Sequence, residues 1–213
     1  MLTKDDLYNM TLQSRVELFE KLLLSTNRDG IDNVIEQLRC TDFYKCPAST
    51  KYHGNYEGGL LDHSLLVCSV AIGIYESMVK ISAKKMESIS RDNIIISALL
   101  HDVCKANYYK KGTKNVKQDG SWRVVETYEV DDQFPFGHGD KSVVLLSMWG
   151  LKMTASEMLA IKWHMANFDL PYGQAQKTFL EAKMMCPLVS LILSADNLSS
   201  QVLEDTMEPN VIG

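Results

Sequence analysis

The stretch Asn93–Lys105, NIIISALLHDVCK, decides the fold. Apolar residues fill it up to an adjacent histidine and aspartate, His101 and Asp102, and Lys105 follows one turn later. The pattern predicts a buried apolar helix that ends in an imidazole and a carboxylate. Placing both groups in the interior costs several kcal/mol unless something compensates them. A metal cation is one compensator, because neutral imidazole and carboxylate are both ligands. A hydrogen-bonded His-Asp pair that caps a core helix is the other.

Length and composition point to one intracellular domain. The chain has 213 residues, is 46% hydrophobic and 23% charged, and can bury a full core. Its net charge of -5 argues against a general nucleic-acid coat or an anionic-membrane binder. Five cysteines form no CxxC pair, which suits a reducing cytosol. The N-terminus lacks a signal-peptide core, and no apolar run approaches the roughly 20 residues of a membrane span. We therefore expect a cytoplasmic protein that binds no membrane.

Helical spacing of apolar residues recurs along most of the chain. Helices are expected over residues 3–24, 31–38, 60–80, 141–149, 154–164, 174–185 and 187–197, besides the one that ends at His101. Ser90 or Asp92 is the expected cap of that helix, and Thr154 with Glu157 forms a capping box. A polar linker is expected over 81–90 and loops over 46–59 and 168–173. The prediction is an all-α bundle.

One β-hairpin is expected within this helical chain, directly after the His-Asp helix. Asp119-Gly120 separates two β-prone stretches, which predicts a hairpin insertion over about 113–130. The surrounding segment holds Lys110, Lys111, Lys114, Lys117 and Arg123 among Tyr108, Tyr109 and Trp122. Cations among aromatics suit a nucleotide, with its phosphates paired and its base stacked. A solvated hairpin whose lysines discourage edge pairing is the other interpretation.

Six chemistry-bearing side chains lie within or beside apolar helical segments: His63, His101, Asp102, His138, His164 and Asp196. A lone histidine on an apolar face is more often a satisfied core residue than a ligand. Six such residues in five separate elements are hard to satisfy independently of one another. A helical bundle can project them inward to a single point, as metal-binding bundles do.

The order His63 … His101-Asp102 … Asp196, with Gly58-Gly59-Leu60 before the first histidine and Lys105 after the doublet, resembles the HD superfamily of metal-dependent phosphohydrolases. The resemblance runs from about His53 to Asn197. With no convincing domain boundary in the sequence, we expect one domain over 1–213, in which N-terminal helices (about 1–45) pack on a metal-binding core (about 53–205). The resemblance implies an all-α core of five or more helices and that His63, His101, Asp102 and Asp196 bind one divalent metal.

Two-metal members of that superfamily have further histidines between the doublet and the final aspartate. By this resemblance Asp102 would bridge two ions, with His138 and His164 on the second. Otherwise His138 stabilises its glycine turn, or both histidines contact substrate phosphate. The donors fit Mn, Fe, Co, Ni, Zn or Mg without choosing among them. Such ions lower the pKa of bound water, so a metal-bound hydroxide would attack phosphorus.

Candidate substrate contacts surround this set. Lys105 follows Asp102 by three residues, on the same expected helix face, and is our first choice for binding phosphate; the alternative is an ordinary surface lysine. The implied catalytic residues are thus Asp102 and Lys105. His53 and Lys110 are further candidates for substrate contact. Asp62 and Asp140 could each orient a neighbouring histidine, although a solvated carboxylate is the preferred interpretation for Asp62.

Three functions are compatible with these residues. The first is a phosphomonoesterase or phosphodiesterase acting on a nucleotide or related small phosphate. The second is a nuclease on short single strands, which the basic hairpin favours and the acidic net charge does not. The third is a metal-bound module that has lost catalysis and acts as a sensor or scaffold. The complete ligand set and Lys105 speak for an enzyme. The pattern does not indicate an oligomeric state.

Overall fold

Helices make up most of the protein, with one small hairpin among the described elements. The computed structural model describes residues 2–118, 120–166 and 174–204. Its elements are α1 (Lys4–Tyr8), α2 (Leu12–Leu24), α3 (Ile31–Arg39), α4 (Gly59–Ile81), α5 (Ala83–Met86), α6 (Arg91–Leu100), a 3-10 turn η1 (Val103–Lys105), β1 (Tyr109–Gln118), β2 (Ser121–Val130), α7 (His138–Met148), α8 (Ala155–Lys162), α9 (Gln174–Met185), α10 (Pro187–Leu198) and a π-helical turn η2 (Ser199–Leu203). The predicted fold class, a helical bundle with a small β insertion, is confirmed.

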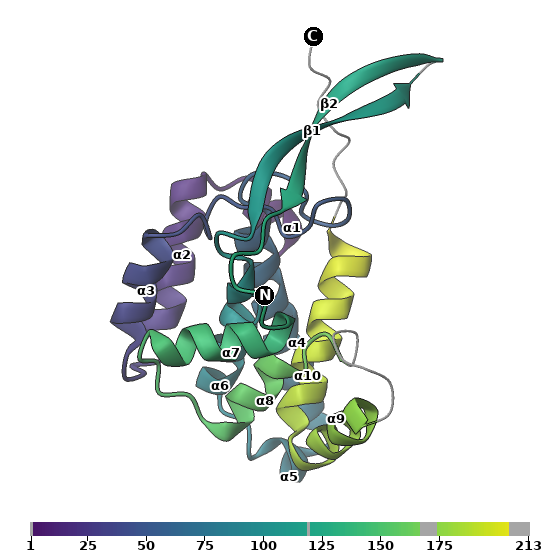
Figure 1. Cartoon of the computed structure of the whole chain (residues 1–213). Coiled ribbons are helices and arrows are strands. Elements are labelled where there is room, and N and C mark those ends of the chain that lie inside the picture. The colour runs from purple at the N-terminus through teal and green to yellow at the C-terminus, as the bar shows by residue number, and fades with distance from the viewer. Residues whose placement is uncertain (1, 119, 167–173, 205–213) are drawn as a thin grey trace.

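The helices that carry the central histidines also form the core. α4 packs against α6 and α10, and α8 packs against α6, α7 and α10 (Figure 1). α6 is buried from Ile94 to Leu100. The Ser90 hydroxyl accepts from the amide of Asn93, whose side chain accepts in turn from the Ser90 amide. The burial predicted for the deciding stretch is confirmed, and Ser90 is its cap.

The sequence predicts one helix over residues 3–24, but the structure has two helices there. α1 ends at Tyr8, and α2 starts at Leu12 because Thr11 caps it by accepting from the Ser14 amide. Buried residues of α2 and α3 nevertheless belong to the same apolar cluster as those of α4, α6, α8 and α10. The assignment of the whole chain to one domain stays a prediction.

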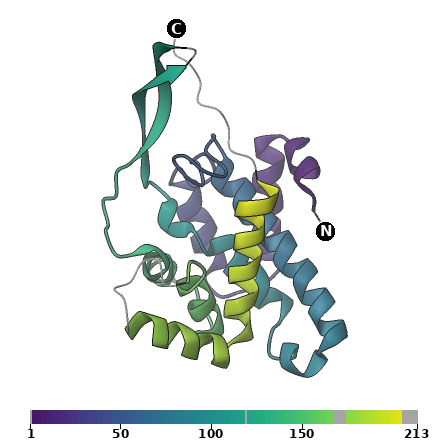
Figure 2. The same cartoon turned by 90° about the vertical axis from the view of Figure 1, so that its right-hand side faces the viewer.

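The hairpin projects away from the helical body in both views (Figures 1 and 2). Its strands are antiparallel, in a register that runs from Tyr109 opposite Val130 to Gln118 opposite Ser121. Of the predicted Asp-Gly turn, Asp119 lies outside the described residues, and Gly120 has a φ of +79°. The hairpin begins four residues earlier than the predicted boundary, because Tyr109–Gly112 already pair with 127–130.

Other boundaries differ in small ways. The polar linker contains the short helix α5, and Met86 and Ile89 on this segment are buried. α7 starts at His138 rather than at 141, so the histidine opens a helix instead of standing in a turn. α8 ends at Lys162, two residues before His164. The loop predicted over 168–173 lies outside the described residues.

α4 corrects the expectation that no apolar run approaches the length of a membrane span. By length and composition alone α4 could cross a membrane, and so could α9 with α10 if that bent pair counted as one span. One or two such helices are weak evidence for a membrane span, because the core helix of a soluble protein passes the same test. The first half of α4, from Gly59 to Ser69, is buried against neighbouring helices.

Candidate metal centre

The end of α6 fixes His101 in one orientation. His101 is the C-cap of the helix, and its ring is fully buried. Nδ1 lies 2.8 Å from the carbonyl oxygen of Ala98, to which it donates its proton. The other ring nitrogen, Nε2, is therefore left with its lone pair directed into the centre of the bundle. That is the state in which an imidazole binds a metal.

A first set of donors converges on this nitrogen. Nε2 of His63, on α4, lies 3.1 Å from Nε2 of His101. It also lies 3.2 Å from Oδ1 of Asp196, which α10 supplies. Oδ2 of Asp102 is 3.4 Å from His101 Nε2 and 3.7 Å from His63 Nε2. A single proton can serve only one of these acceptors at a time, whereas one cation serves all of them.

The other carboxylate oxygen of Asp102 faces a second set of histidine nitrogens. Oδ1 lies 2.7 Å from Nε2 of His138 and 3.3 Å from Nε2 of His164. The Nδ1 of His164 donates to the carbonyl of Ile161 at 2.6 Å, so its Nε2 also carries a lone pair. Within the described part of the chain, this buried Nε2 has no hydrogen-bond partner. An unpaired nitrogen beside a carboxylate is costly unless a cation lies nearby.

The electrostatics of the cluster also suit positive charge at its centre. Burial raises the pKa of Asp102, but Lys105 and His101 outweigh it and hold the pKa well below its usual range. Burial lowers the pKa of His63, but the carboxylates of Glu204 and Asp196 outweigh it and raise the pKa to about 10. Burial lowers the pKa of His164. The residues present thus fit one or two divalent ions, with Asp102 shared between the two sets.

Two glycines allow the elements of the site to approach closely. A Cβ on Gly59 would lie 2.0 Å from the carbonyl oxygen of Gly54, so only glycine lets the preceding loop fold onto the start of α4. A Cβ on Gly139 would lie 2.1 Å from the carbonyl oxygen of Lys162, where α7 meets the end of α8. The first contact holds His53 near His63, and the second holds His138 near His164.

The candidate substrate contacts are placed differently from one another. Lys105 lies in the cluster but not on a continuation of α6, because η1 follows Asp102; its Nζ donates to Asp102 Oδ2 at 2.6 Å. The surface alternative is wrong, since Lys105 is buried. The ring of His53 lies 5.0 Å from that of His63, centroid to centroid. Lys110 is half exposed on β1, and its ammonium is 3.9 Å from Asp131 rather than beside a histidine of the cluster.

Asp62 and Asp140 have partners other than the histidines. Asp62 is buried, and it accepts from Arg15 at 2.6 Å and from the Tyr56 hydroxyl at 3.0 Å. Asp62 therefore neither orients a neighbouring histidine nor faces solvent, so both interpretations of it from the sequence are wrong. Asp140 forms an ion pair with Lys162. Both carboxylates hold elements together instead of contacting a proposed ligand.

Two residues of the cluster were missed in the sequence. Glu204, at the end of η2, accepts from Nδ1 of His63 at 2.7 Å. The thiol of Cys104 lies 3.4 Å from Nδ1 of His138, so a sulfur donor stands beside the second set of ligands. Glu204 follows Asp196 by eight residues, about two helical turns, which is the signal that could have indicated it. Cys104 lies inside the apolar run, where a thiol ordinarily packs as a small hydrophobe.

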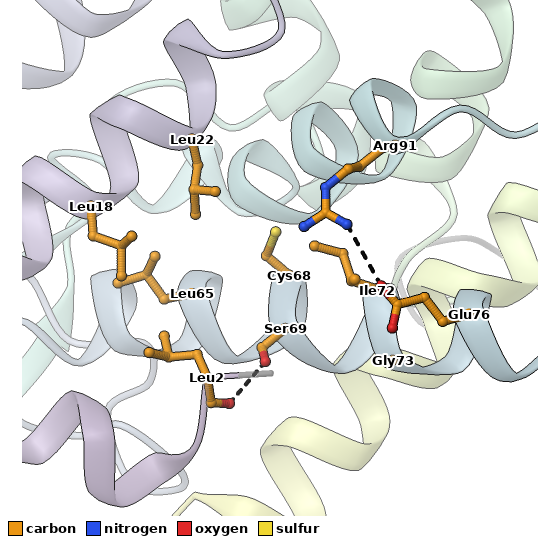
Figure 3. Close-up of a pocket in the computed structure, with 10 residues that line it drawn as sticks. All are labelled: Leu2, Leu18, Leu22, Leu65, Cys68, Ser69, Ile72, Gly73, Glu76 and Arg91. Carbon is orange, nitrogen blue, oxygen red and sulfur yellow. Dashed lines mark hydrogen bonds and ion pairs between the residues drawn. The ribbon is translucent and has the colours of Figure 1, made fainter.

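A separate cavity lies on the far side of α4 (Figure 3). It has a volume of about 240 Å³ and is lined mainly by leucines and isoleucine from α2 and α4, with Arg91 and Glu76 at one end. Leu65 and Ile72 lie roughly 180° around α4 from His63. Burial raises the pKa of the Cys68 thiol there to about 12, so it is no ready nucleophile. The cavity is not part of the metal centre.

Comparison with known proteins gives one partial match. A curated dihydroneopterin 2',3'-cyclic phosphate phosphodiesterase of Methanocaldococcus jannaschii is 31% identical over 87 residues, which are 41% of this chain and 32% of that protein. The match therefore spans about a third of the relative's length. No family model matches the chain, and no solved structure matches it. Over part of its length the chain is similar to a phosphodiesterase and holds a buried His/Asp cluster suited to metal.

Proposed function

We propose that this protein is a metal-dependent phosphohydrolase of the HD type that hydrolyses a phosphate ester of a nucleotide or related small molecule. The observation that carries the proposal is the position of Asp102, whose two carboxylate oxygens face two different groups of histidines. A carboxylate shared in this way could bridge the two ions of a two-metal site. The partial similarity to a phosphodiesterase supports phosphate-ester chemistry.

His63, His101, Asp102 and Asp196 would hold the first ion, and Asp102, His138 and His164 the second. Nitrogen and oxygen donors suit Mn, Fe, Co, Ni, Zn or Mg, and a contribution from Cys104 would favour the softer of these. When bound, such ions lower the pKa of water and neutralise phosphoryl oxygens. The apolar walls around His101 and His164 keep bulk water away from the donors.

The remaining residues serve the substrate. Lys105 carries its charge next to Asp102, where an ammonium also attracts a phosphoryl oxygen. His53 lies beside His63, with 5.0 Å between the ring centroids, and would contact the ester from there. Lys110 and the other hairpin cations would meet the more distant parts of a nucleotide. The similar phosphodiesterase is named for a cyclic phosphate of a pterin, a base-like heterocycle, which is compatible with a nucleotide-like substrate here.

A nuclease or phosphodiesterase on short single strands is the second candidate, because the hairpin extends beyond the helical body with Trp122 72% exposed among cations. A metal-bound sensor or scaffold without catalysis is the third. The first two functions need no membrane, and we propose a cytoplasmic location.

The test is a substrate panel with added Mn or Co. It compares nucleoside monophosphates, 2',3'-cyclic and 3',5'-cyclic nucleotides, cyclic dinucleotides and short oligonucleotides, with metal content measured on the same sample. Turnover of a mononucleotide or cyclic nucleotide that His101→Ala abolishes together with the metal is the expected result. Turnover of oligonucleotides alone would favour the nuclease. Bound metal without turnover of any substrate, or turnover without metal, would contradict the proposal.

A further inference from the structure

We propose that Glu204 is a positioning residue for His63: it holds the Nδ1 proton of that imidazole and so keeps Nε2 directed at the metal centre. The inference rests on the proposed metal site. It assigns a role to the segment after α10, which contributes Glu204 through a π-helical turn. The pattern of metal-ligand residues in the sequence ends at Asp196, eight residues earlier.

The contact between the two side chains is direct and enclosed. Glu204 Oε1 lies 2.7 Å from His63 Nδ1, and each side chain is 1% exposed. A carboxylate at this distance accepts the Nδ1 proton, which fixes both the tautomer and the rotation of the ring. Metal-binding histidines commonly donate their second nitrogen in this way, and the carboxylate makes the first nitrogen a better ligand. His101 and His164 use backbone carbonyls for the same purpose, so His63 is distinguished by a charged partner.

The π-helical turn explains how one segment reaches both sides of the His63 ring. Asp196, on α10, contacts Nε2, and Glu204 contacts Nδ1. In a regular α-helix, residues eight apart differ by roughly 80° around the axis. The wider turn of η2, which runs from Ser199 to Leu203, reduces this offset, and it closes with the Glu204 amide donating to the Ser199 carbonyl at 3.0 Å. Turns of this kind are frequent at functional sites.

The side chain of Glu204 differs from the other acceptors of imidazole protons in this cluster because it is a carboxylate. Among the described residues, the buried Oε2 has no hydrogen-bond partner. An acceptor for Nδ1 could have been a neutral amide or a backbone carbonyl. A carboxylate in this place instead makes the imidazole of His63 a better ligand for a cation at its far side.

The experiment compares Glu204→Gln and Glu204→Ala with a control, Val202→Ala, on the same turn, where Val202 is 69% exposed. Affinity for Zn and Co is measured by competition with a chromophoric chelator, and circular dichroism verifies the fold. We expect Glu204→Ala to weaken metal binding by about 10–100-fold. Glu204→Gln, which keeps an acceptor but loses the charge, should fall between Glu204→Ala and wild type. Val202→Ala should bind as wild type does.

A spectroscopic readout separates positioning from a purely structural role. In the Zn-loaded protein, the proton on His63 Nδ1 should give a strongly hydrogen-bonded imidazole signal in ¹⁵N-resolved NMR, which Glu204→Ala loses while the signals of His101 and His164 persist. Folded Glu204→Gln and Glu204→Ala proteins that bind metal within twofold of wild type would overturn the inference. If Glu204→Ala does not fold, the affinity of Glu204→Gln decides. Affinity is measured without substrate, so a wild type that binds metal but turns nothing over would reject the proposed function and leave this inference standing.

Discussion

Nε2 of His164 faces Oδ1 of Asp102 at 3.3 Å, and neither atom has a proton to share. The imidazole proton is on Nδ1, bound to the Ile161 carbonyl, and the pKa of Asp102 is held well below its usual range chiefly by Lys105 and His101 against the opposing effect of burial. Two acceptors that face each other in a dry interior repel unless positive charge lies close to both. Lys105 and His138 contact the carboxylate of Asp102, but neither is a partner of His164 Nε2. This relationship separates the cluster from an ordinary His-Asp cap.

Removing His164 should therefore remove only part of the metal. If Asp102 bridges two ions, wild type should contain about two ions per chain, His164→Ala about one and Asp102→Ala about none. Elemental analysis of the purified proteins by mass spectrometry measures this. Asp140→Asn is the matched control, since this carboxylate pairs with Lys162 outside the cluster and its loss should leave the metal content unchanged. Equal metal content in wild type and Asp102→Ala would refute the bridging role.

Removing the metal should destabilise the protein. Three carboxylates, of Asp102, Asp196 and Glu204, converge on His63, and a bound divalent ion adds positive charge that offsets their mutual repulsion. An ion present at a hundred times its Kd stabilises by about 2.7 kcal/mol, which corresponds to roughly 5–10 °C in Tm for a chain of this size. Calorimetry before and after a chelator measures the shift, and adding Zn or Mn back should restore it. The same Tm in both states would argue that the cluster does not bind metal.

Much of the fold could be predicted because it rests on local patterns. The apolar run before His101, the Ser90 cap and the Thr154–Glu157 capping box each depend on residues within one or two turns. The break between α1 and α2 was also local: Thr11 followed by Ser14 is a start signal inside a continuous apolar stripe. At Thr11 the capping hydrogen bond starts a new helix although the apolar periodicity continues through this position.

The parts of the site that could not be predicted are long-range pairs. Glu204 meets His63 across 141 residues, and Arg15 meets Asp62 across 47. Nothing near Asp62 distinguishes a carboxylate that pairs with a distant arginine from one that faces solvent. The ion pair of Lys105 with Asp102 is local, but it depends on a 3-10 turn that interrupts the expected helix.

Asp62 should prove structural rather than catalytic. Asp62→Asn removes the charge that compensates Arg15, and both side chains are largely buried. Breaking such a pair costs about 3 kcal/mol, so we expect that loss in urea unfolding of the metal-loaded protein, with unchanged metal content. Glu181→Gln is the control, because its pair with Lys177 is exposed and its removal should change stability by less than about 0.5 kcal/mol. Loss of metal from folded Asp62→Asn would instead support the orienting role first considered for it.

Shortening the hairpin should leave the metal centre intact and weaken substrate binding. Gly112 pairs with Thr127, so replacing residues 113–126 by Asn-Gly closes a shorter hairpin in the same register. The variant removes Trp122 together with Lys114, Lys117 and Arg123. The ligands of the cluster lie on α4, α7 and α10 and just after the ends of α6 and α8. A stacking contact with a base is worth about 1–3 kcal/mol, so KM should rise about fivefold or more with kcat little changed.

Trp122→Ala alone should reproduce most of the effect if stacking dominates, because the ring is exposed and its loss leaves no hole in the core. Steady-state kinetics on a mononucleotide and on a short oligonucleotide show where the hairpin acts. A higher KM for both substrates indicates that it contacts the reacting nucleotide, and a higher KM for the oligonucleotide alone indicates that it contacts the rest of the strand. An unchanged KM for both would mean that the hairpin takes no part in substrate binding.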